Sequence, residues 1–226
     1  MKNKEHVLMI FLMIFTVGLL IIGGTYAYLA YGANVTNGKY NTRVECFKVN
    51  YDIGNEDNTQ NITGTLFPSK DALGGLSGRV SLAIDSSCDV TGEGKLYIHI
   101  NDATSTELLK TVAGHCENSL TLETIADKKD SETCTAQTNG SWVTNGTGIK
   151  YAVFSSGNTT GSPLKKGYIT QSDIGTDIEV YSGFTVSEVI SKFDIYVWQD
   201  GYVTDETYAG LPFSGYIHAE VVQNNQ

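Results

Sequence analysis

This chain has little positive charge and, after its N-terminal segment, almost no pattern typical of a helix. Lysine and arginine total 15 against 25 aspartate and glutamate residues, which leaves a formal net charge of −10. A surface of that sign repels nucleic acid and anionic lipid, so we expect neither as a partner. A parallel sheet needs crossover helices, and the absence of their pattern excludes that class of fold.

Several motifs of catalytic and nucleotide-binding sites are also missing. No HExxH, no GxxxxGK[S/T] loop and no GxGxxG followed by a helix occurs. Beyond the N-terminal segment the histidines are His99, His115 and His218. His99 and His218 fall on the polar faces of predicted strands, where a solvated side chain is the simplest interpretation. We therefore predict no catalytic residues and no enzymatic activity.

A hydrophobic run opens the chain and decides where the rest of it is expected. Residues 7–22 are almost entirely apolar, follow a short polar segment with two lysines, and lead into Gly23-Gly24-Thr25-Tyr26-Ala27. This is the layout of a secretory signal peptide over residues 1–27, with cleavage after Ala27. Residues 7–29 also suffice to span a hydrocarbon core of about 30 Å, so an uncleaved anchor is the alternative. Both interpretations place residues 28–226 outside the cell as one domain, touching the membrane only through residues 7–29.

Short stretches of alternating apolar and polar residues fill the remaining chain. The clearest are residues 80–84 and 95–100, and the glycine-containing connector between them predicts an antiparallel hairpin. About seven to nine such strands with glycine-rich connections predict an all-β fold, an antiparallel β-sandwich of jelly-roll-like or immunoglobulin-like topology. Further strands are expected at 43–51, 120–125, 149–154, 167–169, 193–199 and 213–221, with exposed connections at 113–116 and 127–130.

Two segments allow more than one interpretation. Residues 185–188 read Thr-Val-Ser-Glu, a helical capping box followed by apolar residues at helical spacing, and a strand is the competing prediction. Residues 137–148 contain two Asn-Gly pairs, which predict a loop that presents Trp142. Exposed aromatic rings at Trp142 and Tyr202 would suit stacking on sugars, whereas Trp198 is expected in the core or an interface.

The four cysteines are an even number in a chain expected to be exported, which predicts two disulfides. Three connectivities are possible. Sequence order favours Cys46 with Cys88 and Cys116 with Cys134, because neighbours in sequence meet most easily in a meander of strands. A zinc site is the alternative, although no two cysteines have CxxC spacing.

Two groups of oxygen-bearing side chains have the chemistry that calcium prefers. One comprises Asp52, Asn55, Asp57 and Asn58, and the other Asp200, Asp205 and Glu206. Neither has the spacing of an EF-hand, and the same residue types also make turns. We predict no cofactor, with calcium as the one that the sequence allows.

The N-terminal segment and two C-terminal motifs carry a family resemblance. The apolar run with Gly23-Gly24-Thr25-Tyr26-Ala27-Tyr28 resembles the signal regions of Gram-positive exported proteins processed by the signal peptidase SipW, the group that includes TasA and camelysin. The segments YVWQDG at 196–201 and FSGYI at 213–217 are similar to terminal strands of that group. The resemblance implies a jelly-roll-like sandwich and, for matrix members, fibres in which the N-terminal segment of one subunit pairs with the sheet of the next.

The expected function follows from the export signal, the sandwich and this resemblance. A segment freed by cleavage would offer Tyr28, Leu29, Tyr31 and Val35 as a donor strand for an open sheet edge. We predict a secreted structural subunit of the cell surface or biofilm matrix that associates with itself or with other surface proteins. The first alternative is a membrane-anchored adhesin or carbohydrate-binding module, and the second is an extracellular hydrolase.

Overall fold

The computed structural model describes residues 46–51, 59–88, 90–112, 114–144, 146–159, 161–202 and 209–223. Several predictions lie outside these residues: the signal or anchor, the cleavage site at Ala27 and the donor-strand candidates Tyr28, Leu29, Tyr31 and Val35. The oxygen cluster at 52–58 and the pair Asp205 and Glu206 also lie outside. Within the described part of the chain, no helix is both long enough and apolar enough to cross a bilayer.

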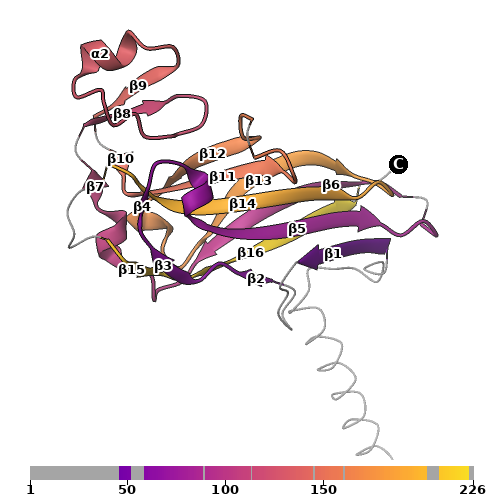
Figure 1. Ribbon diagram of the computed structural model, residues 1–226. Coiled ribbons are helices and arrows are strands. Elements are labelled where there is room, and N and C mark those ends of the chain that lie inside the picture. The colour runs from indigo at the N-terminus through magenta and orange to yellow at the C-terminus, as the bar shows by residue number, and fades with distance from the viewer. Residues whose placement is uncertain are drawn as a thin grey trace, which may run out of the picture. The chain divides into compact units, whose positions relative to one another are not determined.

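Two antiparallel sheets form the body of the molecule (Figure 1). The larger sheet has the strand order β1 (Phe47–Tyr51), β5 (Leu76–Ile84), β14 (Ser191–Asp200), β11 (Ile149–Ser155) and β12 (Lys165–Ile169), and β4 (Pro68–Ser69) joins the end of β14 in parallel. The smaller sheet has the order β13 (Asp177–Val186), β6 (Gly92–Ile100), β16 (Gly215–Gln223) and β2 (Gln60–Asn61).

A dry core separates the two sheets. Every second residue of β6, and of β5 from Gly78 onward, is completely or almost completely buried, as expected for strands with one face on a core. Members of this core include Val80 and Leu82 from β5, Leu96 and Ile98 from β6, and Ile195 from β14. The predicted all-β antiparallel fold is therefore confirmed.

The predicted hairpin between residues 80–84 and 95–100 is wrong, although both strands exist. β5 pairs with β1 and β14, whereas β6 pairs with β13 and β16. The connector between them crosses from one sheet to the other. Each strand buries an apolar face in the same core, so the two strands lie in opposite sheets instead of side by side in one sheet.

Other boundaries differ from the expectations in ways that packing explains. The helix considered at 185–188 is wrong: β13 continues to Val186, which is completely buried, and the chain then bends into β14. The strand expected at 213–221 is divided. Its first residue belongs to β15 (Leu211–Phe213), which pairs with β3 (Gly64–Leu66), and β16 starts at Gly215. Short 3-10 helices lie at η2 (Ala72–Gly74), η3 (Thr106–Leu109) and η4 (Gln171–Asp173).

Residues 114–144 leave the sheets as a small unit, here called the excursion. Its neck is the pairing of β7 (Thr111–Val112) with β10 (Gly146–Thr147). It contains β8 (His115–Asn118), β9 (Gly140–Val143) and the helix α2 (Ser131–Thr135), and it lies at one end of the sheets in Figure 1. Much of the loop predicted at 137–148 is therefore strand, since β9 pairs with β8 and β10 pairs with β7. The strand predicted at 120–125 does not form, because Leu122 has a φ of 61° and Thr124 makes one isolated bridge.

The cysteines are joined in the order that the sequence favoured. One disulfide links Cys46, before β1, to Cys88, and the other links Cys116 of β8 to Cys134 of α2. Both sulfurs of each pair are consumed, so the zinc alternative has no thiolate ligands. Disulfides of this kind persist in oxidising compartments, which is compatible with an extracellular protein.

Candidate functional site

Four titratable side chains meet in the interior where the excursion covers the larger sheet. His115 and Glu117 come from β8, Lys150 from β11 and Asp200 from the end of β14, and none is more than 2% exposed. Lys150 pairs directly with Trp198 in the sheet, and Asp200 lies two residues further on, so all three project from the same face. That face points away from the dry core, and β8 covers it.

Lys150 is the centre of this polar cluster. Its Nζ lies 2.5 Å from Glu117 Oε2 and 2.9 Å from Asp200 Oδ2, and it donates a hydrogen bond of 2.9 Å to the carbonyl of Leu122. An ammonium group has three protons, and three acceptors surround this one. The positive charge of Lys150 is therefore matched within the protein interior, where an isolated charge would be strongly disfavoured.

The two oxygens of Asp200 have different partners. Oδ1 accepts hydrogen bonds from the Thr124 hydroxyl at 2.7 Å and from the backbone N–H of Tyr202 at 2.8 Å. Oδ2 lies 2.8 Å from His115 Nε2 and faces Lys150. One oxygen is thus held by two neutral donors, and the other lies between a lysine and a histidine.

The surroundings hold both carboxylates in their charged form. Burial on its own would raise the pKa of Asp200, but His115, Lys150 and Thr124 outweigh burial and hold this pKa below its usual range. The same balance lowers the pKa of Glu117, to which the Tyr168 hydroxyl also donates a hydrogen bond. In turn, burial and Glu117 raise the pKa of Tyr168.

The donor set of the cluster would suit a divalent cation if Lys150 were elsewhere. His115, Glu117 and Asp200 bring one ligand atom each within 4.8 Å of one another. However, the Lys150 ammonium lies within hydrogen-bonding distance of both carboxylates and fills the place that a cation would take. Asp200, considered for calcium from the sequence, is thus part of a network organised around a lysine.

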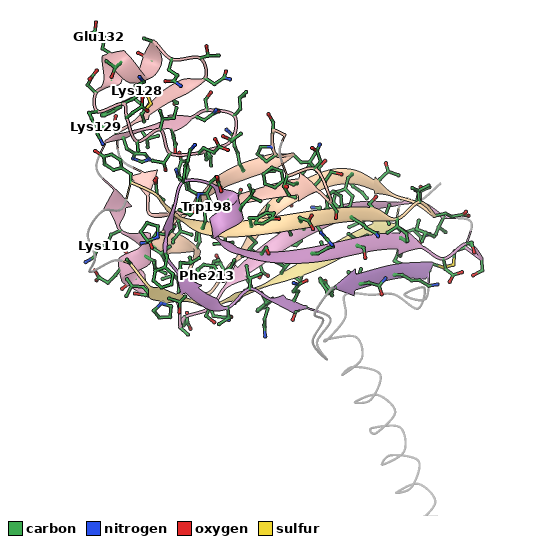
Figure 2. The ribbon with its side chains drawn as sticks, in the orientation of Figure 1. Lys110, Lys128, Lys129, Glu132, Trp198 and Phe213 are labelled. Atoms are coloured by element: carbon green, nitrogen blue, oxygen red, sulfur yellow. A yellow bond between two sulfur atoms is a disulfide. The ribbon has the colours of Figure 1, made fainter. Side chains whose placement is uncertain are left out.

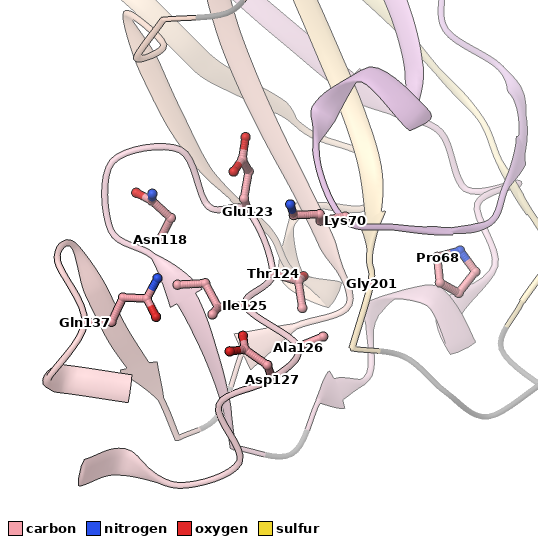
Figure 3. Close-up of a pocket in the computed structure, with 10 residues that line it drawn as sticks. All are labelled: Pro68, Lys70, Asn118, Glu123, Thr124, Ile125, Ala126, Asp127, Gln137 and Gly201. Atoms are coloured by element: carbon pink, nitrogen blue, oxygen red, sulfur yellow. The ribbon is translucent and has the colours of Figure 1, made fainter. Parts of the chain in front are cut away.

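A cleft of about 610 Å³ lies beside this cluster, between the excursion and the end of the larger sheet (Figure 3). Thr124, which contacts Asp200, and Gly201, which follows it, are among the residues that line the cleft. The backbone N–H of Thr124 also bonds to the carbonyl of Lys70, which ties the excursion to the segment after β4. The full lining is Pro68, Lys70, Asn118, Glu123, Thr124, Ile125, Ala126, Asp127, Gln137 and Gly201.

The structure changes the interpretation of several sequence-predicted residues. His115 was expected in an exposed connection and is completely buried, because β8 is covered by the larger sheet and tied to α2 by the disulfide. Tyr202, expected as an exposed sugar-stacking ring, stacks on His115 with ring centroids 5.3 Å apart. Trp142 lies in β9 opposite Cys116 and is partly buried. Trp198 is completely buried, as expected (Figure 2).

Sequence reasoning missed Glu117 and Lys150. A signal for Lys150 was present, because it stands within the strand Ile149–Ser155, whose sequence IKYAVFS is otherwise almost entirely apolar. A lysine in such a strand must either reach solvent or meet a buried carboxylate. Glu117 had no comparable signal, since it lies in a polar segment that reads as a loop.

A second polar group lies on the outward face of the smaller sheet. The rings of His99 and Tyr216 stack at 4.6 Å, and those of Tyr97 and His218 stack at 4.8 Å. Asp177 connects them: its Oδ1 lies 2.7 Å from His99 Nδ1 and 3.3 Å from His218 Nε2. The two histidines are on the polar faces of their strands, as predicted, but they share one carboxylate instead of standing alone in solvent.

Comparison of the chain with protein families, with curated proteins and with solved structures finds no match.

Proposed function

We propose that the protein is a secreted structural subunit of the bacterial cell surface or biofilm matrix, which polymerises when an N-terminal strand of one copy pairs with an open sheet edge of the next. The observation that supports this proposal is the outer edge of β16. On that side, β2 pairs only with Tyr216 and Ile217, and among the described residues no strand pairs with the remainder, His218–Gln223. An open edge of this length is a template for an added strand.

Two other edge strands, β13 and β12, carry features that protect sheet edges in natural proteins. β13 has register irregularities at two places, between Glu179 and Tyr181 and between Ser182 and Phe184. β12 begins with two lysines, Lys165 and Lys166. Bulges and edge lysines both discourage pairing with another chain. The second half of β16 has neither feature and carries Val221 and the exposed Val222.

The backbone groups of β16 that point away from β6 show where a partner strand would bind. The backbone N–H of Ala219 points away from β6 and donates a 3.0 Å hydrogen bond to the Tyr51 hydroxyl. Because strand residues alternate in direction, the N–H of Val221 points the same way. A donated segment such as 28–35 would pair with the Val221 N–H, whereas the Ala219 N–H already has its partner in Tyr51.

The first measurement is the intact mass of protein recovered from the surface of a Gram-positive host. A species that begins at Tyr28 supports a freed subunit, and this species should grow into fibres visible by electron microscopy. Substitution Val222→Lys places a charge on the open edge and should abolish growth. The matched control is Val189→Lys at an exposed turn residue, which should leave fibres unchanged. Monomers under every assembly condition would overturn the proposal.

A second candidate function is a surface-displayed binding module, which the group around Asp177 on the smaller sheet favours. Partly exposed tyrosine and histidine rings next to a carboxylate offer both stacking and hydrogen bonds to a sugar. A full-length, membrane-associated species in the mass measurement would favour this second function. Glycan binding that disappears in Tyr216→Ala but persists in Tyr202→Phe would establish it, and no binding to any glycan would exclude a carbohydrate ligand.

A further inference from the structure

We infer that Lys150 and Asp200 form an intramolecular amide bond, with Glu117 as the general base for the reaction. The Lys150 amine and the Asp200 carboxyl group are held in contact, with Nζ 2.9 Å from Oδ2, and neither side chain has measurable exposure to solvent. Two groups fixed at this separation react as if at very high concentration, because the entropy of bringing them together is already lost on folding. The inference goes beyond the proposed function and does not depend on it.

The nucleophile has a base beside it. Lysine attacks a carboxyl group only as the neutral amine, so its ammonium must lose a proton. Glu117 Oε2 is 2.5 Å from Nζ and is itself buried, which places a carboxylate in position to take that proton. The transfer makes the neutral amine that attack requires, and it takes place within the contact that already joins Glu117 to Lys150.

The electrophile has an arrangement suited to a tetrahedral intermediate. Two donors already point at Asp200 Oδ1, the Thr124 hydroxyl and the Tyr202 backbone N–H. They would stabilise the negative charge that develops on this oxygen during attack, as the donors of an oxyanion hole do. Glu117 has no matching pair, since one oxygen accepts from Tyr168 and the other faces Lys150. Asp200 is therefore the carboxyl group that becomes the amide.

The reaction balances without any added reagent. Glu117 passes one proton from the Lys150 ammonium to Oδ2 of Asp200, which leaves an amine and a carboxylic acid. The lone pair of Nζ then forms a bond to Cγ, and the C=O electron pair moves to Oδ1. A second proton leaves nitrogen through Glu117, and His115, 2.8 Å from Oδ2, relays it to that oxygen. The Cγ–Oδ2 bond breaks, the C=O bond re-forms, and Oδ2 departs as water.

The position of the bond gives it a structural consequence. It would join β11 to the end of β14, two neighbouring strands of the larger sheet, at the base of the excursion. The cleft lined by Thr124 and Gly201 lies next to Asp200 and offers the released water a route to solvent. A covalent link here would keep these strands together under force or protease attack, independently of the two disulfides.

Peptide mass spectrometry of the full chain, reduced, alkylated and cut with trypsin, tests the inference directly. The amide blocks cleavage after Lys150, so residues 130–165 and 193–226 should appear as one cross-linked species. Its mass should be the sum of the two peptides less one water molecule, and fragmentation should place the link between Lys150 and Asp200. Separate peptides with cleavage after Lys150, or a link from Lys150 to Glu117, would overturn the inference.

Variants show whether the named groups perform the reaction. Lys150→Arg keeps the positive charge and should abolish the cross-link completely. Glu117→Gln keeps the size of the base and should reduce cross-linked protein at least tenfold at equal time after synthesis. Lys165→Arg, at an exposed position on β12, is the matched control and should cross-link fully. The peptide measurement on the wild-type protein needs no variant. Absence of the cross-link there overturns the inference even if every variant misfolds.

Discussion

The dry core between the sheets and the polar cluster beneath the excursion are buried to the same degree but are stabilised differently. In the core, side chains such as Leu82, Leu96 and Ile195 are completely excluded from water, and each is worth about 1.5–3 kcal/mol through its apolar area alone. In the cluster, burial opposes folding until Lys150 and Asp200 are paired. Burial by itself therefore stabilises the core. In the cluster, burial is compatible with folding only when each charged group has its partner.

The chemical consequence differs as well. An apolar core tolerates exchange among side chains of similar volume, because its interactions have no direction. The cluster depends on direction, since each oxygen of Asp200 has its own donors and Lys150 has three acceptors. This dependence leaves reactive groups in contact inside the protein, which an apolar core cannot do.

The largest expected effect comes from removing the Lys150 nitrogen at the centre of the cluster. Lys150→Met leaves Glu117 and Asp200 buried without their cation and should lower the free energy of unfolding by about 3–5 kcal/mol. The cost applies whether the wild-type protein has the ion pair or the amide, because the variant leaves the Asp200 carboxylate buried with neither. Urea unfolding followed by tryptophan fluorescence measures it.

The matched control is the triple variant that also carries Glu117→Gln and Asp200→Asn, which should recover at least half of the loss. Equal stability of Lys150→Met and wild type would show that the cluster is solvated and that the contrast with the core does not hold.

The second effect tests the attachment of the excursion. Serine at both Cys116 and Cys134 opens a loop whose ends are 18 residues apart and should cost about 3 kcal/mol in the chain-entropy model. Because β8 carries His115 and Glu117, the cluster should lose protection before the core does. Hydrogen exchange by mass spectrometry would show faster exchange in residues 114–144 and unchanged exchange in β6. Uniform acceleration across the chain would mean that the two regions unfold as one.

A smaller effect is expected within the core. Ile98→Val removes one methyl group from a completely buried side chain and should cost about 1 kcal/mol. No neighbouring group loses a hydrogen bond. The urea concentration at the midpoint of unfolding should therefore decrease, while the slope of the unfolding free energy against urea concentration stays constant. A cost as large as that of Lys150→Met would indicate that packing, not charge, distinguishes the two regions.

The smallest effect concerns alkaline pH. Burial and then Glu220 raise the pKa of Tyr97 to about 12, and burial and then Glu117 raise that of Tyr168. An unfolded tyrosine has a pKa near 10, so the contribution of these groups is present below about pH 10 and lost as pH rises towards 12. Urea unfolding over this interval should show falling stability. Tyr168→Phe should flatten the fall more than Tyr97→Phe, because Tyr168 touches a buried carboxylate.

The comparison also separates what the sequence predicts from what it does not. Alternation in residues 80–84, 95–100 and 193–199 identified strands correctly, because a period of two is a local property. The pairing of β5 with β6 was predicted wrongly. Alternation indicates that one face of a strand is buried, but it does not indicate which strand pairs with its edge. His115 was misplaced for the same reason: its segment is polar, and only the contact of β8 with the larger sheet encloses it.

By itself the sequence determined the all-β class, most of the strands and the acidic balance of charge, and it favoured one of three disulfide pairings. Each of these depends on composition or on residues close together in the chain. Only the tertiary structure decided that His115, Glu117, Lys150 and Asp200 share one interior site. Three segments distant in sequence must fold together before any of these charges has its partner, and no local pattern encodes that meeting.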